Sequence, residues 1–102
     1  MYIMYRHIVL FRIAKEEDRA RLIEMIKELP NKLDFLHDLE VGEDAKHLRQ
    51  YQSDNTYDIG FSCSFDTLED LQRYYAHPVH IELRTALRAV RQDTAMVDWV
   101  VG

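Results

Sequence analysis

The segment between Tyr74 and His80 holds the side chains best suited to chemistry. A histidine, whose pKa lies near neutrality, is a natural general base for removing a proton next to a carbonyl group. A nearby tyrosine hydroxyl can stabilise the oxyanion that forms. We expect Tyr74 and His80 on consecutive helical segments, where both can face one pocket. The alternative is structural: His77 and Pro78 begin a helix, and His80 bonds a backbone group.

A second pair of candidates, His7 and Asp98, lies near the two ends of the chain. If the first and last strands are antiparallel neighbours, the carboxylate can orient the imidazole and stabilise its charged form. The same pair can equally be a buried polar contact that satisfies its own hydrogen bonds. Sequence alone does not set the strand register, so both interpretations stay open.

A metal site is a third option, because His77 and His80 have a spacing that can place two imidazoles on one helix face. No cysteine or Glu-x-x-His nearby supplies a third ligand, and Pro78 between them turns His77 elsewhere. We therefore predict no metal. The sequence also lacks a glycine-rich phosphate loop and a Ser-His-Asp signature.

Three further features are best explained structurally. Cys63 has no basic flanking residue and is expected to be a buried, inert thiol. Tyr75 can stack on an aromatic ligand, but we expect it in the core. A basic stripe on the last helix can attract an anion, although a solvated face paired with acidic neighbours is the usual explanation; it consists of Arg84, Arg88 and Arg91.

Residue periodicity predicts the elements that must position these groups. Strands are expected at residues 5–13, from residue 35, at 57–65 and at 96–101. A helix is expected at residues 15–29, ended by Pro30. A second is expected to begin at Asp66 or Thr67, with its inward residues Leu68, Leu71 and Tyr75, and to be split at Pro78.

The order strand, helix, strand, strand, helix, strand predicts an α+β fold of the ferredoxin-like type, with a four-stranded antiparallel sheet. Helices cover only one face of such a sheet, yet the first and last strands carry apolar side chains on both faces. A bare apolar face is unusual in a soluble monomer. We therefore expect a homodimer in which a second copy covers it.

Composition limits the possible partners. The 102 residues suit one domain spanning 1–102, and 13 Lys and Arg against 18 Asp and Glu give a net charge of −5. This excess of negative charge argues against nucleic acid or an anionic membrane surface as a binding partner. No signal peptide or membrane-spanning stretch is expected, and one cysteine cannot form an internal disulfide, so a cytoplasmic location is the expectation.

Five segments together resemble the stress-responsive A/B barrel domain family of dimeric α/β barrels. They are residues 6–11, 39–42, 57–66, 71–80 and 97–99, in the family's order. The resemblance implies a ferredoxin-like protomer whose sheet meets its partner's sheet to form a barrel, and no cofactor. It does not imply one function, because many members have no assigned activity.

Some members of the family are cyclases that act on polyketide-like substrates without a metal. The resemblance implies that His80 matches the histidine that serves as acid/base in these cyclases and that Tyr74 matches the tyrosine that helps it. It also implies that His7 and Asp98 lie near that site. Two hypotheses follow. In the first, the barrel binds a small apolar or aromatic molecule without established chemistry. In the alternative, the protein is a cofactor-free acid/base enzyme, a cyclase or lyase, that uses His80 with Tyr74.

Overall fold

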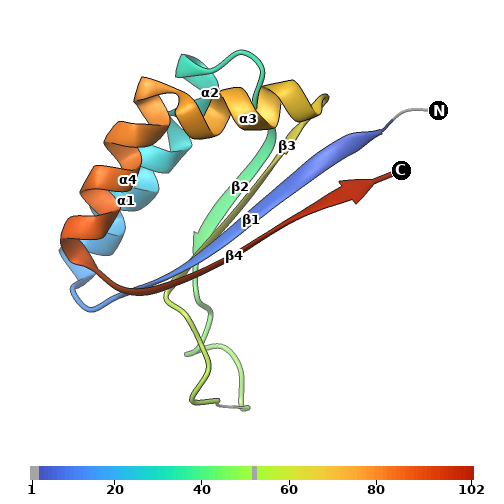
Figure 1. Cartoon of the computed structure of the whole chain (residues 1–102). Helices are drawn as coiled ribbons and strands as arrows, with labels where there is room; N and C mark the ends of the chain where they lie inside the picture. The colour runs from blue at the N-terminus through green and yellow to red at the C-terminus, as the bar shows by residue number, and fades with distance from the viewer. Residues whose placement is uncertain (1–2, 52) are drawn as a thin grey trace.

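The computed structural model describes residues 3–51 and 53–102 and orders them into alternating strands and helices (Figure 1). The elements are β1 (Met4–Ile13), α1 (Glu16–Lys27), α2 (Leu29–Lys32), β2 (His37–Glu43), β3 (Ile59–Phe65), α3 (Leu68–Ala76), α4 (Pro78–Val90) and β4 (Arg91–Val101). No helix in these ranges is both long enough and apolar enough to cross a membrane.

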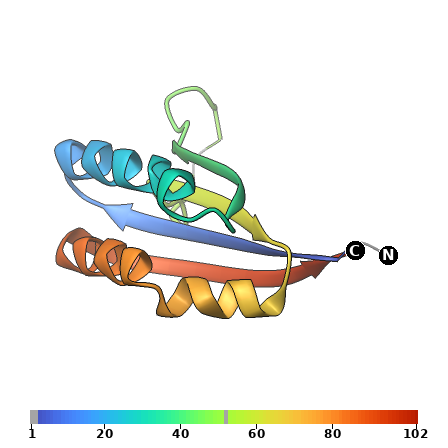
Figure 2. The same ribbon diagram turned by 90° about the horizontal axis from the view of Figure 1, so that it is seen from above.

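The four strands form one antiparallel sheet in the order β2-β3-β1-β4, and the helices pack on one of its faces (Figures 1 and 2). This is the predicted ferredoxin-like α+β fold. The first and last strands are neighbours, and their register pairs His7 with Asp98. The pairing that the sequence left open therefore places both side chains on the helix-covered face.

Strict alternation along β1 divides its side chains between the two faces of the sheet. Val9, Phe11 and Ile13 are buried under the helices, whereas Ile8 and Leu10 point to the opposite face. Buried apolar side chains of α1, α4 and β3 complete the core. They include Leu22, Ile26, Leu83, Leu87, Ile59, Phe61 and Phe65.

The small side chains on the outer face of β3 leave space for their neighbours. Gly60 pairs with Leu10 of β1, and a Cβ atom added at Gly60 would lie 3.3 Å from the Leu10 Cδ2 atom. The leucine side chain thus lies across the glycine. Such close approach explains a glycine within a strand without any unusual backbone dihedral angle.

Strands β2 and β3 each begin two residues later than predicted, and two other boundaries differ for clear physical reasons. Helix α1 ends at Lys27, and Pro30 lies in the first turn of the short helix α2, where its missing N–H costs no hydrogen bond. Strand β4 begins at Arg91, five residues before the predicted start at Met96, because its pairing with β1 extends along the whole of that strand.

The helical hairpin of α3 and α4 turns at His77, which ends one helix and caps the next. The Val79 backbone N–H donates to its Nδ1 atom at 3.1 Å, and Pro78 occupies the first turn of α4. The predicted split is therefore present. The inward face of α3 differs, because Tyr74 is buried beside Leu71, whereas Leu68 is 46% exposed.

Helix α3 depends on its own cap, which provides a first test. The Asp70 N–H donates to the Thr67 hydroxyl at 3.0 Å. We expect Thr67→Ala to lower the free energy of unfolding by about 1 kcal/mol, because one N–H at the helix terminus loses its partner. Urea denaturation measures this, and Thr67→Ser, which keeps the hydroxyl, is the matched control. Equal loss in both variants would show that the cap does not stabilise the helix.

Candidate functional site

A cavity of about 290 Å³ lies between the hairpin of α3 and α4 and the edge of the sheet formed by β1 and β4. Figure 2 shows α3 and α4 on the side of β4, and α1 and α2 on the side of β2 and β3. The wall of the cavity is largely apolar. It includes Val9, Phe11, Phe61, Leu83, Leu87 and Met96. Apolar walls with a few converging polar groups are typical of small-molecule sites.

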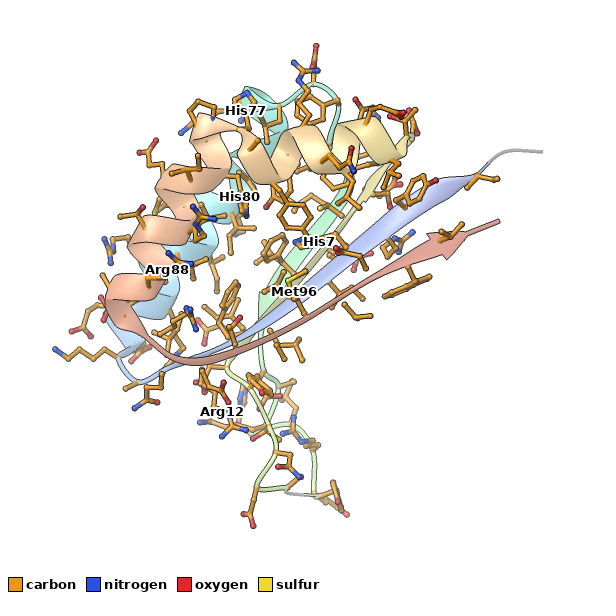
Figure 3. All side chains as sticks on the ribbon, in the orientation of Figure 1. His7, Arg12, His77, His80, Arg88 and Met96 are labelled. Carbon is orange, nitrogen blue, oxygen red and sulfur yellow. The ribbon has the colours of Figure 1, made fainter. Side chains whose placement is uncertain are left out.

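Four polar rings reach this cavity from two sides. His7 enters from β1, while Tyr74, Tyr75 and His80 enter from the helical hairpin. Figure 3 shows His80 on α4 and His7 and Met96 on the facing strands. Each of the two imidazoles packs against both tyrosines, with ring centroids 4.5–5.6 Å apart. The rings thus form one contiguous polar patch in an apolar wall.

The carboxylate of Asp98 ties three elements together. Its Oδ1 atom lies 2.5 Å from His7 Nδ1, and the Tyr75 hydroxyl donates to Oδ2 at 2.5 Å. Because a carboxylate only accepts hydrogen bonds, the Nδ1 atom of His7 must carry the proton. The Nε2 atom of His7 has no hydrogen-bond partner among the residues that the structure describes. Asp98 therefore fixes the tautomer of His7.

Burial decides the charge of His7, whose side chain is only 2% exposed. Desolvation lowers its pKa below 6.5, although the hydrogen bond and charge of Asp98 oppose this. At neutral pH the ring is therefore neutral, with a bare Nε2 atom. The sequence allowed either a buried polar pair or an orienting contact, and the geometry combines both.

His80 repeats this arrangement with a backbone partner. Its Nδ1 atom lies 3.1 Å from the carbonyl oxygen of Tyr75, so Nδ1–H donates. Partial burial lowers the pKa of His80, the backbone hydrogen bond raises it, and the charge of Arg84 lowers it again. The net direction is downward, so the ring is neutral at pH 7. His80 therefore makes the backbone hydrogen bond of the structural alternative, and its ring also lines the cavity.

The two tyrosines of this segment differ in their hydrogen bonding. Tyr74 is completely buried, and its hydroxyl has no hydrogen-bond partner among the described residues. Tyr75, which we expected to pack only in the core, donates to Asp98 and lies 3.1 Å from His7 Nδ1. Burial raises the pKa of both phenols, so neither is ionised at neutral pH.

All four predicted site residues thus meet around one cavity: His80, Tyr74 and His7 line it, and Asp98 holds His7 from behind. The sequence missed Tyr75, because Leu71 has helical neighbours at both +3 and +4 and periodicity does not choose between them. It also assigned the basic stripe of Arg84, Arg88 and Arg91 to a solvated face. The structure places all three at this cavity.

Metal binding finds no support in the described ranges, 3–51 and 53–102, where no cluster of three or more potential ligands exists. His77 caps α4 and does not face His80 across a shared site. Cys63 is fully buried, and desolvation raises the pKa of its thiol to about 12. It is therefore an inert core residue, as predicted.

A larger hollow, about 630 Å³ in volume, lies on the opposite face of the sheet beneath the loop that joins β2 and β3. Leu10, Gly60 and Ser62 line its sheet side, and Asp44 and Arg49 form a bidentate ion pair at its rim. Its lining contains no histidine, the side chain best suited to acid/base chemistry near neutral pH, and its one arginine is paired with Asp44. The smaller cavity is therefore the better candidate for chemistry.

Fold and cavity together define the class of protein: a ferredoxin-like α+β domain with a pocket between its helical hairpin and the edge strand. The chain belongs to the stress responsive A/B barrel domain family, whose model matches residues 5–101. A stress-response A/B barrel domain-containing protein of Arabidopsis thaliana is 22% identical over 98 residues, which are 96% of this chain and 86% of the relative. Two longer Arabidopsis proteins of the same description are 28% and 30% identical; each match covers 92% of this chain but only 35% and 45% of the relatives.

Solved structures agree on the fold. A dimeric protein of unknown function with a ferredoxin-like fold, from Bacteroides fragilis, is 28% identical with a TM-score of 0.73, and the match covers 94% of each chain. A hydroxynitrile lyase from Passiflora edulis has a TM-score of 0.83 over 97% of this chain and 94% of its own, at 15% identity. That likeness shows the fold alone.

Protonation of the two cavity histidines should weaken folding, which provides a second test. Both have a pKa lowered below the unfolded value of 6.5, so the unfolded state binds more protons below that pH. The stabilisation that comes from keeping these two rings neutral is therefore fully present above pH 6.5. It is lost as the pH falls through the lowered pKa values of the folded state. Urea denaturation at pH 7.5, 6.5 and 5.5 measures the loss.

The variant His80→Gln should have a smaller loss between pH 6.5 and 5.5, because its amide does not titrate. His47→Gln, in the exposed loop after β2, is the control and should behave like the parent chain. A loss of the same size in all three proteins would assign the pH dependence to other groups.

Proposed function

We propose that this protein binds a small apolar or aromatic molecule in the cavity between the helical hairpin and β4. One observation carries the proposal: an apolar hollow onto which two neutral imidazoles converge, beside a buried tyrosine hydroxyl that has no partner among the described residues. A buried polar group without a partner costs stability, and ligand contact is one way to satisfy it. The cavity volume of about 290 Å³ suits a ligand of one or two rings.

The acid/base alternative has one structural observation of its own. The Nε2 atoms of His7 and His80 are neutral and unpartnered in the described chain, which is the state that a general base requires. The comparisons do not favour this alternative, since the similar structures include proteins of unknown function as well as a lyase. Binding is therefore the conclusion, and turnover is a separate question for the same cavity.

The bare face of the sheet supports a second proposal, that two copies form a dimer. Ile8 of β1 pairs in register with Val97 of β4, and both point away from the helices. Val97 is 52% exposed and the neighbouring Trp99 is 41% exposed. The similar Bacteroides protein is described as dimeric. A second copy covering this apolar face would remove it from water.

Binding can be followed at the histidine rings themselves. We expect 2-naphthol, a neutral two-ring phenol, to shift the NMR signals of the His7 and His80 rings and leave those of His37 and His47 unchanged. His80→Ala should weaken binding by roughly 3- to 10-fold, the value of one lost hydrogen bond. The matched control is His47→Ala, which should bind like the parent chain.

If neither cavity histidine responds to 2-naphthol or to single-ring phenols, the binding proposal is wrong. If a bound compound is also converted, and His80→Ala lowers its turnover by about 100-fold or more, the acid/base alternative replaces simple binding.

The dimer can be tested by charging the bare sheet face. Val97→Asp places a carboxylate where the second copy would pack, and we expect the mass in solution to change from dimer to monomer. Light scattering after size-exclusion chromatography measures this. Ile81→Asp makes the same change at a residue of α4 that is 40% exposed on the helical side, and should leave the mass unchanged. A parent chain that is monomeric at micromolar concentration contradicts the proposal.

A further inference from the structure

The side of α4 that faces the cavity carries a row of basic side chains, of which the arginines are charged at neutral pH. His80, Arg84 and Arg88 follow one another at a spacing of four residues, so they lie along one line of the helix. Arg91, the first residue of β4, continues the row, and all four side chains line the cavity. Figure 3 shows His80 and Arg88 along α4, opposite the strand that carries Met96. The apolar hollow thus has a cationic rim.

These arginines have no acidic partner within the described ranges. The ion pairs of residues 3–51 and 53–102 involve other basic side chains, and no Asp or Glu stands three or four residues from Arg84. Placing Arg84 four residues before Arg88 is unfavourable for the helix, because like charges at this spacing repel. The prediction that acidic neighbours pair with this arginine stripe is therefore wrong.

Ordinary helix electrostatics explains only part of this row. Arg88 lies in the last turn of α4, where the helix dipole favours a positive charge. Arg84 lies more than one turn earlier, beyond the reach of that effect. It also faces His80, whose pKa its charge lowers. A bound anion would offset the repulsion among these groups.

The interior of the cavity indicates the chemistry of the part of the ligand that does not contact the arginines. Phe61, Leu83 and Leu87 provide an apolar surface, and Tyr74 lies on the same wall with its hydroxyl buried and unpartnered within the described chain. A ligand that satisfies both regions needs a flat apolar body and one anionic group at its end. A guanidinium group presents paired N–H donors that match a carboxylate in two parallel hydrogen bonds.

We propose, building on the proposed function, that the molecule bound in this cavity is an aromatic carboxylate whose ring packs between Phe61 and Leu83 and whose carboxylate is bound by Arg84 and Arg88. The arginine row selects the charge of the ligand, and the apolar wall selects its body. The imidazoles of His7 and His80 lie deeper, at the ring.

Two probes of equal shape test the charge separately from the body: 2-naphthoate and its neutral amide, 2-naphthamide. We expect calorimetry on the full chain at low salt to give at least tenfold tighter binding of 2-naphthoate. Arg84→Gln and Arg88→Gln should each remove most of this preference, because they should weaken the binding of 2-naphthoate far more than that of 2-naphthamide. Arg21→Gln on α1, which removes an arginine paired with Asp18, is the control for net charge and should retain the preference.

The outcomes separate this inference from the proposed function. Equal binding of both probes leaves the apolar binding site in place and overturns the carboxylate inference. Binding of neither probe overturns the proposed function and this inference with it. A preference that falls equally in Arg21→Gln also overturns the inference, because net charge and not the arginine row would then select the anion. Circular dichroism of each variant confirms that it is folded.

Discussion

The carboxylate of Asp98 holds together the parts of the structure on which the site depends. It accepts hydrogen bonds from His7 on β1 and from Tyr75 on α3, so one side chain of the edge strand connects the sheet to the helical hairpin. Charge-assisted hydrogen bonds are stronger than neutral ones, and these lie in a largely apolar setting. Without Asp98, the His7 ring would be buried with neither a fixed tautomer nor a charged partner.

Burial and hydrogen bonding act on the two cavity imidazoles in parallel ways. Each ring donates from Nδ1, one to a carboxylate and the other to a backbone carbonyl, and each has a pKa lowered by desolvation. The rest of the lining is apolar, apart from Tyr74, Tyr75, Thr94 and the row of arginines at the rim. The site therefore combines a neutral polar interior with a cationic edge, and in the proposed complex these two regions would contact different parts of the ligand.

Sequence pattern was sufficient for the fold because the strands alternate clearly and Pro78 marks the split between α3 and α4. Topology was sufficient to bring His7 and Asp98 together, because the first and last strands are neighbours. The grouping of this pair with His80 and Tyr74 came only from the resemblance to the family. Sequence pattern did not distinguish Tyr74 from Tyr75, since a rotation of one residue about the helix axis exchanges buried and hydrogen-bonded positions. It also did not place the arginine row at the cavity, because that depends on how far the hairpin stands from the edge strand β4.

The tautomers of His7 and His80 have a consequence for the hydrogens that a ligand carries. In both rings the only N–H group already donates a hydrogen bond, so each neutral Nε2 atom can accept a hydrogen bond but cannot donate one. A hydroxyl group on the ligand can satisfy such an atom, whereas an ether oxygen placed there meets a lone pair and gains nothing. In the proposed complex, the interior would therefore discriminate between an alcohol and its methyl ether, two molecules of nearly the same shape, by the presence of one hydrogen atom.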